Sequence, residues 1–569
     1  MAYIDALRSD ETLIGRLGEP NAHMIWALGL YLEEPDLEAL ASESLTDGPN
    51  DKKIDFIRLD RDAKRIVFAQ GCFATAEKAE APANKASDLN TAAAWLFSGD
   101  ISLVPEQLRP VIEDCRTAIE DGDITAIELI YVHNLPESIN VSRELQTATT
   151  FLQKALGESA IRATSRELGR SMIEHLFAGQ ESHIAVKGDI NCPSQMQFSE
   201  KGTKWEASIM SIPGVWLHQL FLQHGDALFS ANYRGFLGIT RRRRINTGIR
   251  QSAESKPGDF WAFNNGITLL TLGKRETKDG TVLTGISIIN GAQTTGSIGA
   301  VDLSKYDLKG VKVLCRVIQC SDADTIADIV KYNNTQNEIT TWDQYSNDPD
   351  QNRIYEEFGK LGHTYARKRT ISLKGDQIGI EEVAQPLLAF RGKFQDANRS
   401  KNQIFERRPL YKLAFEGKKA THVLFVYSLG RSIDEWRIEL KKKSTAGTII
   451  SIEEQQLALL RNLKFKYFFI SLVGRCLETL LGRKVDLETI AFTVDVSNAK
   501  ANTLLSLAAL WSPVIQAILS FAVTGLTLET FSARGAEDTL LEEIAKQVNG
   551  LLYVSKTGAA NPGFLHSLT

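Results

Sequence analysis

Two short apolar runs near the start of the sequence place an acid opposite an amide. Residues 54–73, IDFIRLDRDAKRIVFAQGCF, read as two strands joined by a charged turn. Side chains on one face of paired strands meet, so Asp55 and Gln70 would lie together, with Cys72 on the same face. Carboxylate and amide oxygens held in this way bind Mg²⁺ or Mn²⁺, which catalyse phosphodiester hydrolysis. Asp55 is therefore a candidate metal ligand, and Gln70 is a second ligand or the group that orients the attacking water.

The third position of this predicted site lacks the charge that the chemistry needs. A lysine is expected two residues after the amide, because its ammonium stabilises the developing phosphorane charge. Cys72 takes that position, and its neutral thiol carries no fixed charge. Lys78 or Lys85 would have to supply the cation, while Asp47 and Asp51 could add carboxylates. Spacing alone favours a solvated hairpin with a polar turn, because acid and amide pairs of this kind are common.

Three later segments, FNNGIT, INGAQTT and YNNTQNEIT, each place amides at the end of an apolar element. Amides donate and accept hydrogen bonds, so they suit a base edge, a ribose or a peptide backbone. Gly291 also leaves backbone N–H groups free where a helix should begin, which is a natural phosphate cradle. The alternative is ordinary turn and capping chemistry. The candidate ligand-binding residues are Asn264, Asn265, Asn290, Gln293, Thr294, Asn333, Asn334, Gln336 and Asn337.

An arginine-rich segment lies between these two regions. Residues 234–250, RGFLGITRRRRINTGIR, contain six arginines and no acid. Four consecutive arginines cannot share one face of an element, so a loop or strand end is expected, and phosphate contact competes with a solvated or salt-bridged run. YARKRTISLKG is a second, weaker basic patch. The candidate phosphate-binding residues are Arg234, Arg241, Arg242, Arg243 and Arg244.

The bulk composition limits the class of protein. A net charge of −5 excludes a globally basic nucleic-acid coat but allows a local basic groove. Six scattered cysteines without a C-x-x-C, and no apolar segment at the N-terminus, indicate a reduced, cytoplasmic protein. Neither a P-loop nor a G-x-S-x-G or H-E-x-x-H motif is present.

Residues 504–528 need separate attention because they carry no charge and are long enough to span a bilayer. Pro513 follows Ser512 as a first helical residue follows its N-cap. Gln516, Ser520 and Thr524 would form a polar stripe at helical spacing. We therefore expect a buried pair of helices and no membrane span.

The order of the predicted elements indicates an α/β protein. Helical periodicity over residues 20–45, the hairpin, a further helix, the strand in AIELIYVHNLPES and another helix follow one another. Between residues 180 and 310 strand signals dominate, and FWAFNNGITLLTL predicts a hairpin around Asn265-Gly266. After about residue 375 the chain becomes helical, with one long helix expected in SIEEQQLALLRNLKFKYFFISLVGRCLETLL.

The middle of the chain resembles the AIPR family, named for abortive-infection phage resistance. The matching blocks are NYRGFLG with the following IN, FWAFNNGIT, IINGAQTTGSI, KYNNTQNEIT with WDQYSNDPDQ, and YARKR, and they cover roughly residues 185–420. NGAQT and NNTQNEI also look distantly like ParB and DGQHR domains. The resemblance implies an N-terminal restriction-endonuclease-like α/β domain at 1–175, a mixed α/β AIPR core at 180–420 and a helical domain at 421–569.

The resemblance implies an antiphage defence protein that acts on or senses nucleic acid, DNA above all. In one hypothesis it is a Mg²⁺-dependent endonuclease in which Asp55, Gln70 and Cys72 occupy the catalytic positions. In the alternative, a vestigial site leaves a non-catalytic sensor or scaffold that binds nucleic acid, a nucleotide or a phage protein. A third reading is a nucleotide-dependent enzyme. A phage-derived trigger, an operon partner protein and self-association are the expected partners.

Overall fold

The computed structural model of the 569-residue chain groups its elements into two compact units. One unit combines residues 1–6 with 172–339, and the other combines residues 7–171 with 340–569. Residues 172–339 are therefore an insertion between two parts of the larger unit, and the three-domain division expected from the sequence stays a prediction. The structure describes every residue except 1, 47–53, 98–99, 158, 182–183, 185, 230–242, 335–344, 346–347, 368–376, 495–499, 556–563, 565–567 and 569.

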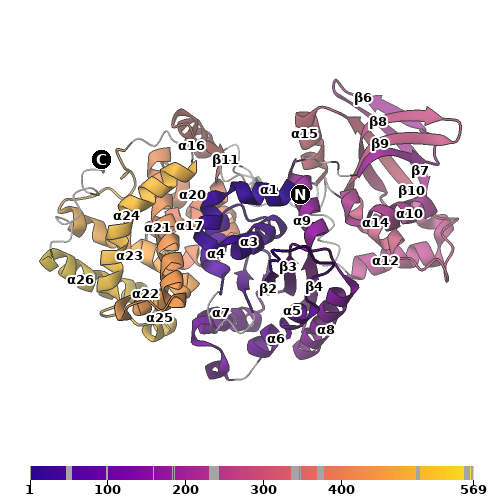
Figure 1. Cartoon of the computed structure of the whole chain (residues 1–569). Coiled ribbons are helices and arrows are strands. Elements are labelled where there is room, and N and C mark those ends of the chain that lie inside the picture. The colour runs from indigo at the N-terminus through magenta and orange to yellow at the C-terminus, as the bar shows by residue number, and fades with distance from the viewer. Residues whose placement is uncertain are drawn as a thin grey trace. The chain divides into compact units, whose positions relative to one another are not determined.

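A four-stranded sheet forms the centre of the N-terminal part of the larger unit (Figure 1). The chain begins with α1 (Ala2–Ser9), whose first residues belong to the smaller unit. Up to residue 168 the elements of the larger unit are then α2 (Glu11–Leu17), α3 (Glu19–Leu32), α4 (Leu37–Ser44), β1 (Phe56–Asp60), β2 (Arg65–Cys72), α5 (Ala83–Ser87), α6 (Asn90–Phe97), α7 (Arg109–Glu120), β3 (Ala126–His133), α8 (Ile139–Leu156) and β4 (Arg162–Leu168). β1 pairs antiparallel with β2, and β2, β3 and β4 run parallel. The predicted hairpin is confirmed: Ile57, Ile66 and Phe68 are buried in a core shared with α5 to α8.

The C-terminal part of the larger unit is almost entirely helical (Figure 1). Its elements are α16 (Pro349–Lys360), β11 (Thr364–Ala366), β12 (Gln377–Gly379), α17 (Ile380–Phe390), α18 (Phe394–Ala397), α19 (Lys401–Glu406), α20 (Arg408–Phe415), α21 (Ala420–Thr445), α22 (Ser451–Arg461), α23 (Leu463–Leu481), α24 (Lys500–Ala522), α25 (Leu528–Arg534) and α26 (Asp538–Ser555). The single long helix expected after residue 451 is wrong. Asn462 interrupts it with an extended backbone and caps α23 by accepting the Lys464 backbone N–H.

The uncharged segment forms one helix, α24, and not the predicted pair, because Pro513 lies inside the helix. By length and composition Thr503–Ala522 could cross a membrane, and it is the one such helix among the described residues. However, α24 packs against α21, and Trp511 is fully buried there. Ser520 of the predicted polar stripe accepts a hydrogen bond from Gln456 of α22. These contacts are those of a helix that packs inside the helical part of the larger unit.

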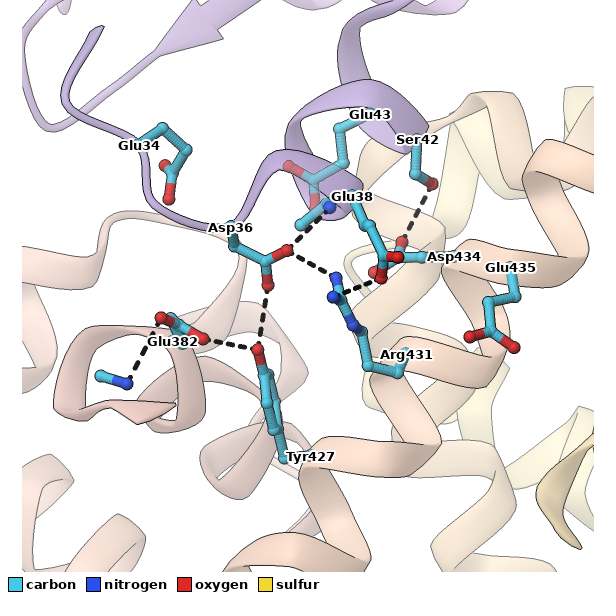
Figure 2. Close-up of polar contacts among 12 residues, drawn as sticks. Glu34, Asp36, Glu38, Ser42, Glu43, Glu382, Tyr427, Arg431, Asp434 and Glu435 are labelled. Carbon is cyan, nitrogen blue, oxygen red and sulfur yellow. Dashed lines mark hydrogen bonds and ion pairs between the residues drawn. The ribbon is translucent and has the colours of Figure 1, made fainter. Parts of the chain in front are cut away.

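Buried charges join the N-terminal part of the larger unit to its C-terminal helices, as Figure 2 shows. Asp36, the N-cap of α4, accepts hydrogen bonds from Arg431 Nη1 at 2.5 Å and from the Tyr427 hydroxyl at 3.0 Å. Arg431 also pairs with Glu38, and its side chain is 12% exposed. Burial lowers the pKa of Arg431, but the attraction of Asp36 and Glu38 outweighs burial and raises that pKa above its ordinary value. Removing either partner would leave an uncompensated buried charge.

A second set of ion pairs continues this contact. Lys466 of α23 donates to Asp434 of α21 at 2.7 Å and to Glu43 of α4 at 3.1 Å. The Ser42 hydroxyl donates to Asp434 at 3.1 Å (Figure 2). The charges enclose a cavity of about 70 Å³. Because cations and carboxylates there pair with one another, we interpret this region as a charged seam between two parts of one unit.

The smaller unit is built on a six-stranded mixed sheet in the order β5-β9-β8-β10-β7-β6 (Figure 1). Its elements are α9 (Arg170–Glu181), β5 (Val186–Cys192), β6 (Phe198–Lys201), β7 (Trp205–Pro213), α10 (Gly214–His224), α12 (Arg243–Ser255), α13 (Phe260–Phe263), β8 (Ile267–Thr277), β9 (Gly280–Asn290), α14 (Ala292–Gly299), β10 (Lys312–Cys320) and α15 (Ala323–Asn334). β8 pairs antiparallel with β9 and parallel with β10. One face carries α10, α12 and α14, and the other carries α15.

The hairpin predicted around Asn265-Gly266 is wrong. Phe260 is fully buried, and the residues after it form the short helix α13 instead of a strand. Gly266, with φ of 79°, turns the chain from this helix into β8. The actual hairpin joins β8 to β9, where Thr277 pairs with Gly280. The strand, turn and helix predicted for GTVLTGISIINGAQTTGSIGA are confirmed by β9, Gly291 and α14.

Candidate functional site

Asp55 and Gln70 meet at the end of the β1–β2 hairpin. The Gln70 side chain donates its Nε2–H to Asp55 Oδ2 at 2.7 Å, and the Gly71 backbone N–H donates to the same oxygen at 2.8 Å. Gln70 is only 3% exposed, and its Oε1 is buried without a hydrogen-bond partner among the described residues. The contact is therefore a shielded carboxylate–amide pair whose facing oxygen already accepts two N–H groups.

Cys72 lies on the same face, two residues beyond Gln70. The register of β2 and β3 pairs Gln70 with Tyr131 and Cys72 with His133. The Tyr131 hydroxyl donates to the Pro82 carbonyl oxygen at 3.1 Å, and burial, followed by the nearby Cys72, raises the pKa of Tyr131. The neighbouring strands β2 and β3 thus present a thiol and a phenol where the predicted nuclease motif calls for an ammonium, and relocation of the cation to Lys78 or Lys85 stays a prediction.

His133 stands beside Cys72, but both of its ring nitrogens are engaged. Nε2 forms a hydrogen bond with Glu167 Oε1 of β4 at 3.0 Å, and Nδ1 forms one with the Leu135 carbonyl oxygen at 3.0 Å. A histidine that activates a thiol needs a ring nitrogen directed at the sulfur. His133 therefore orients the end of the sheet and is not placed to act as a base for Cys72.

The described residues around Asp55 do not fit a divalent metal by themselves. Within the described ranges, no group of three His, Cys, Asp or Glu side chains could hold a metal ion. Mg²⁺ requires oxygen ligands in near-octahedral geometry, whereas Gln70 turns an N–H toward Asp55. Asp47 and Asp51, the other predicted carboxylates, lie outside the described residues. The assignment of Mg²⁺ or Mn²⁺ stays a prediction.

In the smaller unit, two glycines bring the predicted amide segments together at one end of β8. A Cβ at Gly266 would lie 2.3 Å from the Leu314 carbonyl oxygen of β10. A Cβ at Gly291, where φ is 89°, would lie 2.7 Å from the Gly266 carbonyl oxygen. Both positions have positive φ, so glycine is required for conformation as well as for space. The starts of β8 and α14 are therefore in direct backbone contact.

Asn264 and Thr294 connect the two turns through their side chains. Asn264 Nδ2 donates to Thr294 Oγ1 at 3.1 Å, and Asn264 Oδ1 accepts the Gly266 backbone N–H at 2.8 Å. Thr294 is buried on α14, whereas the neighbouring Asn265 is exposed and Gln293 is half-buried. Asn264 and Thr294 thus stabilise the turn, and Asn265 is left accessible to a ligand.

A row of polar residues crosses three strands beside this turn. Backbone pairing places Asn290 of β9 next to Thr268 of β8, and Thr268 next to Arg316 of β10. Arg316 donates from Nη2 to Asn333 Oδ1 near the end of α15, and Asn333 donates to the Ile329 carbonyl oxygen at 2.8 Å. Amides from all three predicted segments therefore converge on the same end of β8.

The other predicted contacts cannot be placed in the same way. Arg243 and Arg244 begin α12, and Asn334 ends α15, but the side chains of these residues are not among those described. The predicted residues outside the described part of the chain are Arg234, Arg241, Arg242, Gln336 and Asn337. Their roles stay predictions.

Arg316 is the functional candidate that sequence reasoning missed. It is exposed in the middle of a strand in which Cys315 and Val317 are buried. The signal was available, because a lone arginine inside the apolar run VLCRVI must either face solvent or bind a partner. Its pairing with Asn333 depends on where α15 packs, which the sequence does not state.

Comparison with known proteins places the chain in a family. The sequence profile of a family described as AIPR protein matches residues 229–518, a span of just over half of the chain. The matched span includes β8, α14, Arg316 and Asn333, but it begins after the Asp55–Gln70 pair. No curated protein and no solved structure matches the chain. The chain belongs to the AIPR family, as its sequence blocks predicted.

Proposed function

We propose that this AIPR protein acts in antiphage defence as a sensor that binds nucleic acid at the polar end of β8. Family membership supplies the abortive-infection role. The observation that supports nucleic-acid binding is the convergence of Asn290, Thr268, Arg316 and Asn333 on one end of the sheet.

The chemistry of this cluster suits a nucleic acid. Arginine and asparagine are the side chains that most often contact guanine and adenine edges, and arginine also pairs with phosphates. α14 begins at Gly291 within the same cluster, and its first backbone N–H groups favour an anion. The chain has a net charge of −5, so the attraction must come from such a local site.

Binding to a labelled oligonucleotide tests the proposal through Arg316→Ala and Asn333→Ala. Loss of a good arginine contact weakens binding by about 1–3 kcal/mol, which is roughly 5- to 150-fold. Arg275→Ala is the matched control, because Arg275 is 66% exposed on β8 of the same sheet but lies outside the cluster. Equal binding by wild type, Arg316→Ala and Arg275→Ala would contradict the proposal.

Metal-dependent cleavage at the hairpin is the second candidate. The proximity of Asp55 and Gln70 favours it, and further ligands would have to come from outside the described residues. Plasmid DNA and RNA are incubated with Mg²⁺ or Mn²⁺ and the wild type, Asp55→Ala or Cys72→Lys. Cleavage that disappears in Asp55→Ala supports an active nuclease. Cleavage that appears only in Cys72→Lys indicates a degenerate site. Equal nicking by all three proteins refutes a hydrolytic role for this pair.

The partners expected from the sequence are proposals of the same kind. A phage-derived trigger or an operon partner protein would engage the sensor, and self-association would amplify its response. Copurification from phage-infected cells and light scattering of the pure protein test these two expectations.

A further inference from the structure

We propose that Trp261 and Phe263 of α13 are stacking platforms for the bases of a single-stranded nucleic acid. This inference rests on the proposed nucleic-acid function and names its substrate class. Trp261 is 49% exposed and Phe263 is 58% exposed, although both belong to a four-residue helix that packs against β10. Two exposed aromatic rings only two residues apart form a paired surface, unlike a single exposed ring such as Phe198.

The conformation of α13 explains why these two rings face outward. Phe260 is fully buried in the core of the smaller unit and anchors the helix. Successive helical residues are rotated by about 100°, so Trp261 and Phe263 project from the two flanks of the helix when Phe260 points inward. A strand that crosses the exposed side over Ala262 would therefore meet one ring on each flank.

The surroundings of the rings favour a polyanion over an apolar partner. Lys256 Nζ lies 5.9 Å from the centre of the Phe263 ring. The loop that carries the exposed Lys309 packs on the turn before α13, where Gly310 lies near Pro257, and the exposed Lys312 begins β10 directly after this loop. Among the described residues, these three lysines form no ion pair with an acid. The exposed carboxylates nearest to them in the chain are Asp259 beside the helix and Asp307 in the loop, so the lysines outnumber them.

The position of α13 links the rings to the polar cluster. Asn264 and the exposed Asn265 follow Phe263 directly, and Gly266 lies against Leu314, two residues from Arg316. Stacking on the rings would thus present neighbouring bases or phosphates to amides and to an arginine. Exposed base faces are available in a single strand and are covered in a duplex, so this arrangement selects single strands.

Fluorescence anisotropy with the full-length protein tests the proposal, using a labelled 20-nucleotide single-stranded DNA, the same sequence as RNA and the DNA duplex. We expect the wild type to prefer the single strands. Each ring removed in Trp261→Ala and Phe263→Ala should weaken single-strand binding by about 5- to 150-fold. Trp261→Phe should retain most of the affinity, because stacking requires an aromatic face and not an indole.

Phe198→Ala is the matched control, since Phe198 is 59% exposed on the edge strand β6 of the same unit. Circular dichroism confirms that each variant is folded. Equal affinity of the wild type for duplex and single strands overturns the inference, as does unchanged binding by the double variant Trp261→Ala/Phe263→Ala. If that double variant binds normally while Arg316→Ala does not, the stacking role fails and the proposed function stands. A change in oligomeric state without a change in binding would assign the rings to a second copy of the chain and also overturn the inference.

Discussion

Replacing Arg431 with methionine is expected to loosen the contact between α4 and α21. Arg431 bridges Asp36 and Glu38 across parts of the chain that are 395 residues apart. Breaking a buried ion pair by removing one partner costs about 3–5 kcal/mol. The lower value applies here, because Asp36 keeps the Tyr427 hydroxyl and Glu38 keeps Arg16 at 2.6 Å. A loss of about 3 kcal/mol corresponds to a roughly 150-fold increase in local opening.

Hydrogen exchange read by mass spectrometry is the suitable assay, because a chain of two units does not unfold in one step. Peptides from Leu37–Ser44 and Ala420–Thr445 should lose protection together in Arg431→Met, while peptides from residues 267–320 keep theirs. The double variant Asp36→Asn/Arg431→Met should be less perturbed than Arg431→Met alone, because the neutral amide leaves no unpaired charge at residue 36.

The control for this experiment is Arg534→Met. Arg534 forms a bidentate pair with Glu543 between α25 and α26, but its side chain is 37% exposed. Exposed pairs contribute little, so no change in exchange is expected from this variant. If Arg431→Met exchanges as slowly as the wild type, the buried bridge is not what holds α4 to α21, and the reasoning about the charged seam is wrong.

Three further outcomes follow from single contacts. Burial, then the neighbouring His133, lowers the pKa of His23 to about 3. Because the unfolded segment takes up this proton near pH 6.5, the free energy of opening of α3 should fall by about 1 kcal/mol between pH 6.5 and 5.5, and less in His23→Phe. Hydrogen exchange of peptides from Glu19–Leu32, corrected for the intrinsic exchange rate at each pH, measures this change. Gly291→Ala should lower the stability of the smaller unit by at least about 1–2 kcal/mol, since φ there is 89° and the new Cβ would meet Gly266. A lower melting temperature together with weaker oligonucleotide binding would reveal this loss. Asp62 of the β1–β2 turn accepts the Asn402 backbone N–H at 3.0 Å in the first turn of α19. Asp62→Ala should therefore lower the opening free energy of α19, measured by hydrogen exchange, by about 1–2 kcal/mol. Asp62→Asn should retain most of that stability, because its side-chain oxygen can still accept the N–H.

The elements with strong local patterns could be predicted from the sequence. Alternating apolar residues identified the β1–β2 hairpin, and its register brings Asp55 to Gln70 because paired strands have a period of two. Asn265-Gly266 misled the prediction because its hairpin signal is local, whereas burial of Phe260 is a tertiary effect. Pro513 also misled the prediction, because proline is usual in the first turn of a helix, whereas here it lies inside α24.

The parts that escaped prediction depend on contacts between distant segments. Nothing local connects Asp36 with Arg431, or Arg316 with Asn333, because each pair forms only after helices pack. The rings of Trp261 and Phe263 stood inside a segment singled out for its amides, and their exposure became evident only once α13 had a buried side. The candidate site was therefore predictable in its amides and not in its arginine or its aromatic surface.

The insertion of residues 172–339 within the larger unit has a consequence for how the protein is made. Proteins begin to fold from their N-terminal end while the ribosome is still extending the chain. Here the side chains of Asp36, Glu38 and Glu43 would remain exposed to solvent until their partners on α21 and α23 had left the ribosome. A nascent chain halted halfway would leave Asp36 and Glu43 of the α4 region without the cations of α21 and α23. Completion of synthesis thus becomes a condition for closing the larger unit.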